Sequence, residues 1–580
     1  MDKRLLPKKM RSPTHINIIG ASKSIYNREI LRELASERGF ANLVRRLDPG
    51  ESIVFTSKVE DEHDIEPLVR YLIRHGVPRS DIRVRYPADS GQVILELAMA
   101  RGIVESGLNF GADVAERDER LNRYFITTSA FQSIRKHEKH IVVGPKGSGK
   151  SAILRELSTL SPESLVVTPE HYATEVLDAI SKMPGDTELA AYTTTWKYTL
   201  LIEVFRRIAQ NKIGDARAVA EIRRYLVAHG HMEGELTIFE RFMAYLRRIK
   251  QLKGKIGSVE AEFGVEKAEE LRKFFKMDEL QQLIPELQKS LRRTAFTVYI
   301  DELDQSWNNT DTANRFLVSL LTAAIQLRSL SENLHVVAFL RSEIFDLLKP
   351  HLPQLDKLRS DIELLQWSTR ELTNIIVTRA VDSLNITGDI EAESAIRAIF
   401  TGRHDVDTAG SFEYLLARTS LRPREVIQFS NLALKVAGRD GRRSITPEAV
   451  QQAEEEFSTW KLEHIVAENM YIYPRLNELF ERFRGKSRTF SAHAMEAVLA
   501  DILLDYGEDS KKPDWIRSEW EPADLLKLLY QLEVIGIEKV TTESGGPRQW
   551  DFVFARPKGR PEQSASFLFH PGLWKALELI

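Results

Sequence analysis

The alternation of apolar and polar positions divides the chain into regions with different expected secondary structure. Near the N-terminus, short apolar runs with the pattern of strands alternate with amphipathic runs that repeat every three or four residues. The expected strands are 15–19, 52–56 and 82–86, and the expected helices are 29–38, 65–75 and 93–105. Because strands alternate with helices, residues 1–110 are predicted to form a small α/β domain, whose role the sequence leaves open.

A second α/β region is predicted at 111–369, where apolar runs again precede helical ones. Its expected strands are 141–143, 296–304, 335–342 and 362–367. Between the first two of these, leucine, isoleucine and phenylalanine at three- and four-residue spacing predict a helical insertion at about 192–291. No pattern in that stretch is typical of a catalytic site, so it is interpreted as an insertion or lid.

Two further regions follow. Residues 370–465 are predicted to form a helical lid, with one helix beginning at Arg370 and another capped by Thr446, with Pro447 in its first turn. Residues 466–580 are predicted to form a winged-helix-like domain, in which three helices precede a β-hairpin. The expected helices are 475–483, 492–504 and 522–533, and the hairpin strands 550–554 and 566–570 are joined by the basic turn 555–561.

Composition narrows the classes of protein that fit. With 580 residues, 43% of them hydrophobic and 28% charged, the chain is long enough for several globular domains. The absence of cysteine excludes disulfides and thiolate metal sites. A formal charge of −3 gives no global attraction to nucleic acid or to anionic membranes. No apolar run approaches the ~20 residues that span a bilayer, and the basic start lacks the apolar core of a signal peptide, so we expect a cytoplasmic protein without membrane contact.

The stretch from His140 to Ser151 has the order of a phosphate-binding loop: a buried strand, then Gly-x4-Gly-Lys-Ser, then an amphipathic helix. Glycines let successive backbone N–H groups turn toward a phosphate, and the helix N-terminus adds its positive end. Lys150 is expected to reach the β- and γ-phosphates, and Ser151 to ligate Mg²⁺. The predicted nucleotide-binding residues of the loop are Gly144, Pro145, Lys146, Gly147, Ser148, Gly149, Lys150, Ser151 and Ala152.

A second chemical motif follows the apolar run that begins at Phe296. Asp301 and Glu302 place two carboxylates at the tip of a buried strand. Asp301 is predicted to hold the Mg²⁺ hydration shell, and Glu302 to polarise the attacking water as the general base. At the tip of the next strand, Arg341 or Ser342 is expected to sense the γ-phosphate, and Arg341 is counted among the predicted catalytic residues.

Some residues keep both a structural and a functional interpretation. Arg359, just ahead of the last strand, would either project into the nucleotide of a neighbouring subunit or form a surface salt bridge. Tyr124 and Phe125 would either flank an adenine or pack in the core. Three polar residues near the third N-terminal strand are explained equally well by a ligand site, by a helix cap and by a solvated face; they are Asp89, Ser90 and Glu96.

The C-terminal region carries two basic features. The turn 555–561 is suited to lie along a nucleic-acid backbone, and a second basic patch precedes it. The patch residues are Arg482, Arg484, Lys486 and Arg488. The alternative is a solvated loop in a domain that makes protein contacts.

The motifs occur in a recognisable order: the Gly-Pro-Lys-Gly-Ser-Gly-Lys-Ser loop, Tyr-Ile-Asp-Glu-Leu-Asp, Phe-Leu-Arg-Ser-Glu-Ile-Phe, and Leu-Arg-Pro-Arg-Glu at 421–425. In that order they resemble the bacterial P-loop ATPases of the AAA+/STAND and KAP-like groups, most of all a soluble type met in defence and mobile-element neighbourhoods. The resemblance covers about residues 112–580. It implies a five-stranded sheet in the order 5-1-4-3-2, and a second sensor, Arg422 or Arg424, that reaches the nucleotide from the lid. The gap between Lys150 and Asp301 is longer than in ordinary AAA+ modules, and its residues are too polar for the membrane-spanning insertions of some KAP-like proteins.

Together these features predict an α/β fold: a P-loop NTPase core with a five-stranded parallel sheet, a helical insertion and lid, a C-terminal winged helix and a small N-terminal domain. The expected function is a switch that binds ATP and Mg²⁺, hydrolyses ATP and rearranges its flanking domains, with bacterial defence as the setting that the resemblance suggests. Two alternatives stay open: a DNA-binding initiator or loader, and a defence effector with a second activity in residues 14–107. The expected partners are ATP, further copies of the chain and, through the winged helix, DNA.

Overall fold

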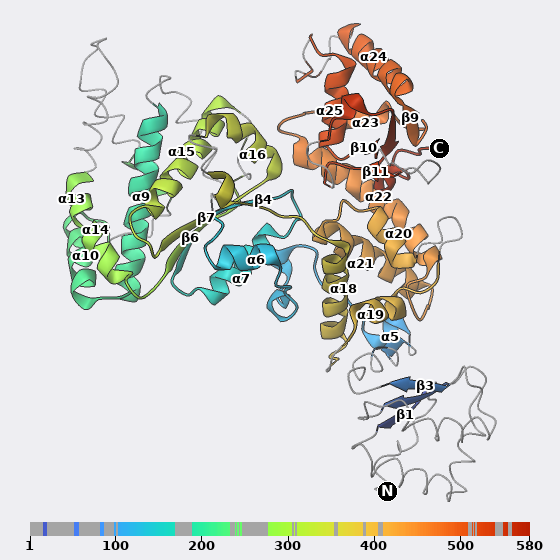
Figure 1. Ribbon diagram of the computed structural model, residues 1–580, viewed down its shortest axis with the longest axis horizontal. Helices are drawn as coiled ribbons and strands as arrows, with labels where there is room; N and C mark the ends of the chain where they lie inside the picture. Colours follow the sequence, from blue (N-terminus) through green and yellow to red (C-terminus); the bar gives the residue numbers. More distant parts are fainter. Residues whose placement is uncertain are drawn as a thin grey trace, which may run out of the picture.

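A computed structural model of the 580-residue chain gives the arrangement of its elements (Figure 1). It describes residues 15–19, 52–56, 82–85, 95, 98–99, 102–168, 188–232, 238, 240–242, 244–245, 277–303, 307, 310–352, 358–386, 390–403, 410–508, 513, 515–516, 519–539, 549–554 and 559–580. The sheet and the helices of the insertion lie on the left of Figure 1. The orange lid helices lie between the N-terminal strands and the red C-terminal domain.

Five parallel strands form the central sheet, in the spatial order β5-β6-β7-β4-β8. They are β4 (Ile141–Val143), β5 (Ser164–Val167), β6 (Phe296–Ile300), β7 (Leu334–Leu340) and β8 (Ile362–Leu364). Numbered along the chain, this is the predicted order 5-1-4-3-2. β7 lies between β4 and β6, and because all the strands are parallel, their carboxyl ends lie at one edge of the sheet.

Helices cover both faces of this sheet. They are α6 (Ser129–Arg135) and α7 (Lys150–Leu160) on one face, and α9 (Glu188–Asn211) and α15 (Asp311–Arg328) on the other. Successive side chains of a strand point to opposite faces, so Tyr299 packs with α6 and α7 while Val298 and Ile300 pack with α9 and α15. Every residue of β6 is buried for this reason.

The insertion packs on the second face of the sheet as part of the core. Besides α9 it contains α10 (Ala216–Ala228), α13 (Met277–Gln282) and α14 (Ile284–Ser290). Trp196 of α9 is fully buried, with its ring centroid 4.2 Å from that of Phe242 and 5.2 Å from that of Phe316 on α15. Within the described ranges, neither α9 nor another helix is long and apolar enough to cross a membrane.

In the region predicted as a lid, the described residues form five helices after the sheet. They are α18 (Thr369–Ser383), α19 (Ala392–Ile399), α20 (Ser411–Ala417), α21 (Pro423–Arg439) and α22 (Pro447–Asn469). Phe429 of α21 stacks on Phe457 of α22 at 4.2 Å. Thr446 precedes α22 and Pro447 begins it, as predicted. Thr446 is the N-cap residue of α22, as predicted, although its hydroxyl donates to the Glu448 carboxylate and accepts no backbone N–H.

The described part of the N-terminal region is a three-stranded parallel sheet in the order β1-β2-β3. Its strands are β1 (His15–Ile19), β2 (Ser52–Thr56) and β3 (Ile82–Arg85), close to the predicted bounds. The predicted helices 29–38 and 65–75 lie outside the described residues, and 93–105 is described only in part. The polar candidates Asp89, Ser90 and Glu96 also lie outside the described residues.

The last residues of the N-terminal region pack on the lid. Helix α5 (Ile103–Ser106) lies beside the lid helices (Figure 1). Five apolar side chains share one hydrophobic core with α18 and α21; they are Leu95, Met99, Ile103, Leu108 and Phe110. The residues that precede the central sheet in the sequence are therefore part of the hydrophobic core of the lid.

The C-terminal domain places helices against an antiparallel sheet of order β11-β10-β12-β9. Its elements are α23 (Leu476–Glu481), β9 (Thr489–Ser491), α24 (Ala492–Glu508), α25 (Pro522–Gln531), β10 (Ile535–Glu538), β11 (Trp550–Asp551) and β12 (Ser566–Phe569). The two predicted hairpin strands do not pair with each other, because β10 lies between them. Gly536 of β10 makes room for Phe552, whose ring would lie 2.9 Å from a Cβ at that position.

Candidate nucleotide-binding site

The predicted phosphate loop joins the end of β4 to the start of α7. Gly147 and Gly149 have φ angles of +78° and +92°, which residues with a side chain rarely adopt. Lys150 begins the helix, and its Nζ donates to the carbonyl oxygens of Gly144 (2.8 Å) and Pro145 (2.9 Å). The lysine thus folds back across the loop and holds its ammonium beside the first loop residues. A loop with this backbone has the conformation that turns N–H groups toward an anion.

Two segments from beyond the sheet hold the outer side of the loop. The Arg424 N–H, at the start of α21, donates to the Gly147 carbonyl at 3.3 Å, and a Cβ on Gly147 would lie 2.9 Å from the Arg424 Cβ. The Trp367 indole N–H, between β8 and α18, donates to the Ser148 carbonyl at 2.9 Å. Sequence reasoning missed Trp367, which it counted only as the end of a strand. An indole at the junction of a strand and a lid was the available signal.

The acidic pair follows β6 at the same edge of the sheet. The Asp301 N–H donates to the Val167 carbonyl at 3.1 Å, which extends the pairing of β6 with β5, and the Asp301 side chain is buried. Glu302 has a φ of +58°, a left-handed conformation that costs a non-glycine residue on the order of 1 kcal/mol or more. This turn ends the strand and redirects the chain at the predicted catalytic pair. The carboxylate of Asp301 and the hydroxyl of Ser151 are hard oxygen ligands of the kind Mg²⁺ prefers.

Arg341 and Ser342 lie at the end of β7, between the loop and the acidic pair. Arg341 precedes α16 (Ser342–Leu348). Burial opposes the charge on Glu468 of α22, but a hydrogen bond from His464 and the charges of Arg422, His464 and Arg341 outweigh burial and lower the pKa of Glu468 to about 2. Glu343 follows Ser342 directly. Burial raises the pKa of Glu343, and the Glu468 carboxylate raises it further, against the opposing charges of Arg422 and Lys150.

The two candidate second sensors lie in different surroundings. Arg424 packs its side chain on the loop, with its Nε 4.0 Å from an Asp113 carboxylate oxygen. Arg422 is buried among carboxylates, and its guanidinium lies 2.7 Å from Glu533 and 3.7 Å from Glu468. Burial opposes the charge on Arg422, but Glu533 and the other carboxylates outweigh burial and raise the pKa of Arg422. Of the two arginines, Arg424 packs against the phosphate loop, whereas Arg422 lies among carboxylates.

A cavity of about 710 Å³ lies beside the first loop residues, between the core and the C-terminal domain. Gly144, Pro145 and Ser148 line it from the loop, while Glu343 lines it from α16. On the opposite side it is lined by Arg422 and by the end of α25. The cavity thus connects the loop, the lid and the C-terminal domain.

Tyr124 and Phe125 are both engaged in packing. The Tyr124 hydroxyl donates to Asp118, and its ring lies under the Arg379 guanidinium at 4.6 Å. Phe125 makes an edge-to-face contact with Phe131 at 4.9 Å. These contacts favour the core interpretation over adenine stacking.

Arg359 lies in a short 3-10 turn ahead of β8 and is exposed. Because β8 is parallel to β4, this turn lies at the amino end of the strands, opposite the phosphate loop. Arg359 therefore belongs to no site around the loop of its own chain.

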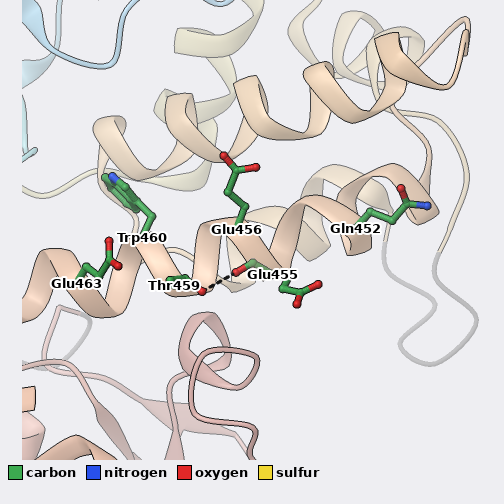
Figure 2. A pocket seen from close by; sticks show the side chains of 6 residues that line it. All are labelled: Gln452, Glu455, Glu456, Thr459, Trp460 and Glu463. Carbon is green, nitrogen blue, oxygen red and sulfur yellow. Dashed lines mark hydrogen bonds between the residues drawn. The ribbon is translucent and has the colours of Figure 1, made fainter. Parts of the chain in front are cut away.

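A second hollow, of about 550 Å³, lies on α22 away from the loop (Figure 2). It is lined by Gln452, Glu455, Glu456, Thr459, Trp460 and Glu463. These side chains offer carboxylates and one indole. The Thr459 hydroxyl donates to the Glu455 carbonyl at 3.1 Å, and the Glu456 carboxylate pairs with Lys435 at 3.7 Å. Among the described residues, no group of three or more acidic or histidine side chains is arranged to hold a metal ion by itself.

Comparisons with known proteins match two segments of the chain to families. Residues 114–169 match the family described as ORC-CDC6-like, and residues 370–466 match the family described as FunZ-associated C-terminal helical domain. A relative from Escherichia coli (strain K12), "Putative transposon gamma-delta 80.3 kDa protein", is 22% identical over 502 residues, which cover 83% of this chain and 68% of the relative. A solved structure of Drosophila ORC bound to DNA aligns with 84% of this chain and 92% of its own at 14% identity, with a TM-score of 0.23.

The first matched segment contains the phosphate loop and α7, and the second coincides with the helices α18 to α22. The resemblance to the STAND and KAP-like groups stays a prediction. The segment similar to the ORC-CDC6-like family carries the phosphate loop, which follows β4 of the five-stranded parallel sheet.

Proposed function

We propose that this chain is an ATP-binding and ATP-hydrolysing switch that couples the state of its nucleotide to the arrangement of its lid and C-terminal domain. The observation that carries the proposal is the seating of the lid on the loop. The N–H of Arg424 bonds to Gly147 and the indole of Trp367 bonds to Ser148. A change in the loop on phosphate binding therefore acts directly on the first residues of the lid.

The predicted catalytic and metal-binding residues each have a role in this proposal. Lys150 exchanges its two loop carbonyls for phosphate oxygens, and the loop N–H groups and the N-terminus of α7 surround the phosphates. Ser151 and Asp301 hold Mg²⁺, which neutralises charge on the phosphates. Glu302 accepts a proton from the attacking water, and Arg341 stabilises charge on the γ-phosphate.

Two substitutions test this proposal. Lys150→Ala removes the phosphate-binding ammonium and is expected to lose ATP binding. Glu302→Gln is expected to bind ATP and to hydrolyse it about 100-fold more slowly or worse, because it lacks the general base. Binding is measured with a fluorescent nucleotide, and turnover by phosphate release. Lys435→Ala, at an exposed lid lysine, is the control; unchanged turnover in both site variants would remove the assignment.

DNA binding by the C-terminal domain is a second candidate function. The order α23, β9, α24, α25, β10, β11, β12 supports the predicted winged helix, in which α25 would enter the major groove. Leu528 and Gln531 of α25 instead line the cavity beside the phosphate loop. DNA binding through α25 would therefore require this domain to move.

The proposed basic patch is largely engaged within the domain. Arg482 pairs with Asp505 at 2.9 Å, Arg484 pairs with Glu481 and Glu578, and the Arg488 guanidinium lies over the Trp574 ring at 4.6 Å. Most of the turn residues 555–561 lie outside the described residues.

The test is salt-dependent binding of a DNA duplex, with and without a slowly hydrolysed ATP analogue. Changing Arg556, Lys558 and Arg560 to alanine should weaken the binding and reduce its salt dependence. If no duplex binds at low salt in either nucleotide state, this candidate is removed.

A further inference from the structure

Arg422 joins three parts of the molecule through its carboxylate partners. Glu425 belongs to the same helix, Glu468 to α22 and Glu533 to the C-terminal domain. The shortest contact, 2.7 Å, is the one to Glu533, and both side chains are 11% exposed. Removing one partner of a buried ion pair leaves the other charge uncompensated and destabilises the folded protein. The contact between Arg422 and Glu533 therefore links the C-terminal domain to the lid.

The carboxylates around Arg422 are shared with other basic side chains. Lys461 pairs with Glu425 at 2.6 Å, and His464 pairs with Glu468 at 3.0 Å. Glu343 lines the cavity beside the phosphate loop and has a buried carboxylate oxygen with no hydrogen-bond partner. Arg422 is thus shared among several acids.

Arg422 also has unused capacity to bind an anion. Its Nε is buried without a hydrogen-bond partner. The guanidinium lines the same cavity of about 710 Å³ as Gly144, Pro145 and Ser148 of the phosphate loop. A terminal phosphate on that loop would bring into the cavity an anion that guanidinium groups bind strongly.

A phosphate in the cavity would compete with Glu533 for the Arg422 guanidinium. Glu533 lies in the turn between α25 and β10 and has a left-handed backbone conformation, with a φ of +61°. α25, which ends two residues earlier, lines the cavity. A change at Glu533 therefore acts on the helix that faces the loop.

We propose that Glu533 is a positioning residue for nucleotide sensing, which holds Arg422 toward the C-terminal domain until the γ-phosphate of ATP competes for the guanidinium. The inference rests on the proposed ATP binding. When phosphate binds Arg422, the contact to Glu533 weakens and α25 is free to leave the cavity.

The test compares the affinities of the full chain for a slowly hydrolysed ATP analogue and for ADP. Glu533→Gln removes the competing charge, so the analogue should bind about 3- to 10-fold more tightly while ADP, which lacks the γ-phosphate, binds as before. Glu533→Asp keeps the charge and should stay near the wild type. Arg422→Gln should bind the analogue no better than ADP, and adding Glu533→Gln to it should change nothing further.

Controls separate this proposal from the proposed function and from misfolding. Glu578→Gln breaks an exposed ion pair of the same domain with Arg484 and should leave both affinities unchanged. Should Glu533→Gln not fold, Glu468→Gln removes a second partner of Arg422 and should also tighten analogue binding. If the folded variants bind the analogue as the wild type does while Lys150→Ala loses it, the role of Glu533 is refuted and ATP binding stands.

Discussion

Two separate features require a glycine at Gly147: the backbone conformation of the loop and the close approach of the lid. The φ of +78° disfavours any side chain, and a Cβ would lie 2.9 Å from the Arg424 Cβ. The contact with the lid exists only in the folded protein, where α21 begins against the loop. The glycine spacing predicted the backbone conformation but not this contact.

We expect Gly147→Ala to weaken nucleotide binding by shifting α21 away from the loop, in addition to a backbone cost of about 1–3 kcal/mol. Gly230→Ala is the matched control, because Gly230 has a φ of +67° and no atom within 4 Å of an added Cβ. Both variants should melt at a lower temperature, but only Gly147→Ala should lose affinity for the ATP analogue. Equal affinities would show that the contact with Arg424 is unimportant.

Three histidines meet at the amino end of the strands. His137 stacks on His335 with a centroid separation of 3.6 Å, and the ring of His140 lies 6.4 Å from that of His335. Burial lowers the pKa of both His140 and His335 to about 4. The folded chain therefore keeps these rings neutral at pH values at which the unfolded chain, with a pKa of 6.5, binds protons.

The stability that these rings contribute should be complete above pH 6.5 and should be lost as the pH falls toward 4. For each ring the loss by pH 5 is on the order of 1–2 kcal/mol. His335→Phe keeps a flat ring against His137 and removes one titrating group. Its melting temperature should fall less between pH 7 and pH 5 than that of the wild type; an equal fall would contradict this account.

Sequence reasoning could not say which of Arg422 and Arg424 packs against the phosphate loop. Both lie in Leu-Arg-Pro-Arg-Glu at the start of one helix, and a helix turns neighbouring side chains to different sides. Which side faces the loop depends on how the lid sits on the sheet. Glu533, more than a hundred residues away, carried no motif at all.

At the scale of elements, the strand order of the central sheet was implied by the family resemblance, and β5 (Ser164–Val167) was not among the strands expected from apolar runs. The pairing of the C-terminal sheet was not predicted either. β10 contains only Ile-Gly-Ile-Glu, too short and too glycine-containing for a clear alternating pattern, so its place between the predicted hairpin strands was missed. Its glycine is needed because Phe552 occupies the space of a side chain.

Arg379 of α18 binds the segment that precedes the central sheet. Arg379 donates to the carbonyl oxygens of Phe110 at 2.7 Å and Ala112 at 3.0 Å, and it pairs with buried Asp118 at 3.0 Å. Arg379→Met would leave Asp118 as an uncompensated buried charge, at a cost of about 3–5 kcal/mol.

The loss should appear as a clear drop in melting temperature. Arg397→Met on α19, whose partner Glu393 is also exposed, should change it little. Similar melting temperatures for the two variants would mean that Asp118 finds another partner or becomes protonated without loss.

At the scale of the whole molecule, contacts between distant segments decide the arrangement. No local pattern announces that α25 lines a cavity beside the phosphate loop, because its apolar residues serve both its own domain and that contact. The same holds for the end of the N-terminal region, whose helical pattern is compatible with any apolar neighbour.

The sharing of the lid core by Leu95, Met99 and Ile103 decides where the chain can be shortened. A fragment of residues 108–580 strips these three side chains from the lid, each worth roughly 1.5–3 kcal/mol of burial. A fragment of residues 91–580 keeps them and should melt near the temperature of the full chain, well above the shorter one. Any phenotype lost at 108 but retained at 91 would then report a damaged lid, and only a cut ahead of residue 95 can isolate the task of the N-terminal strands.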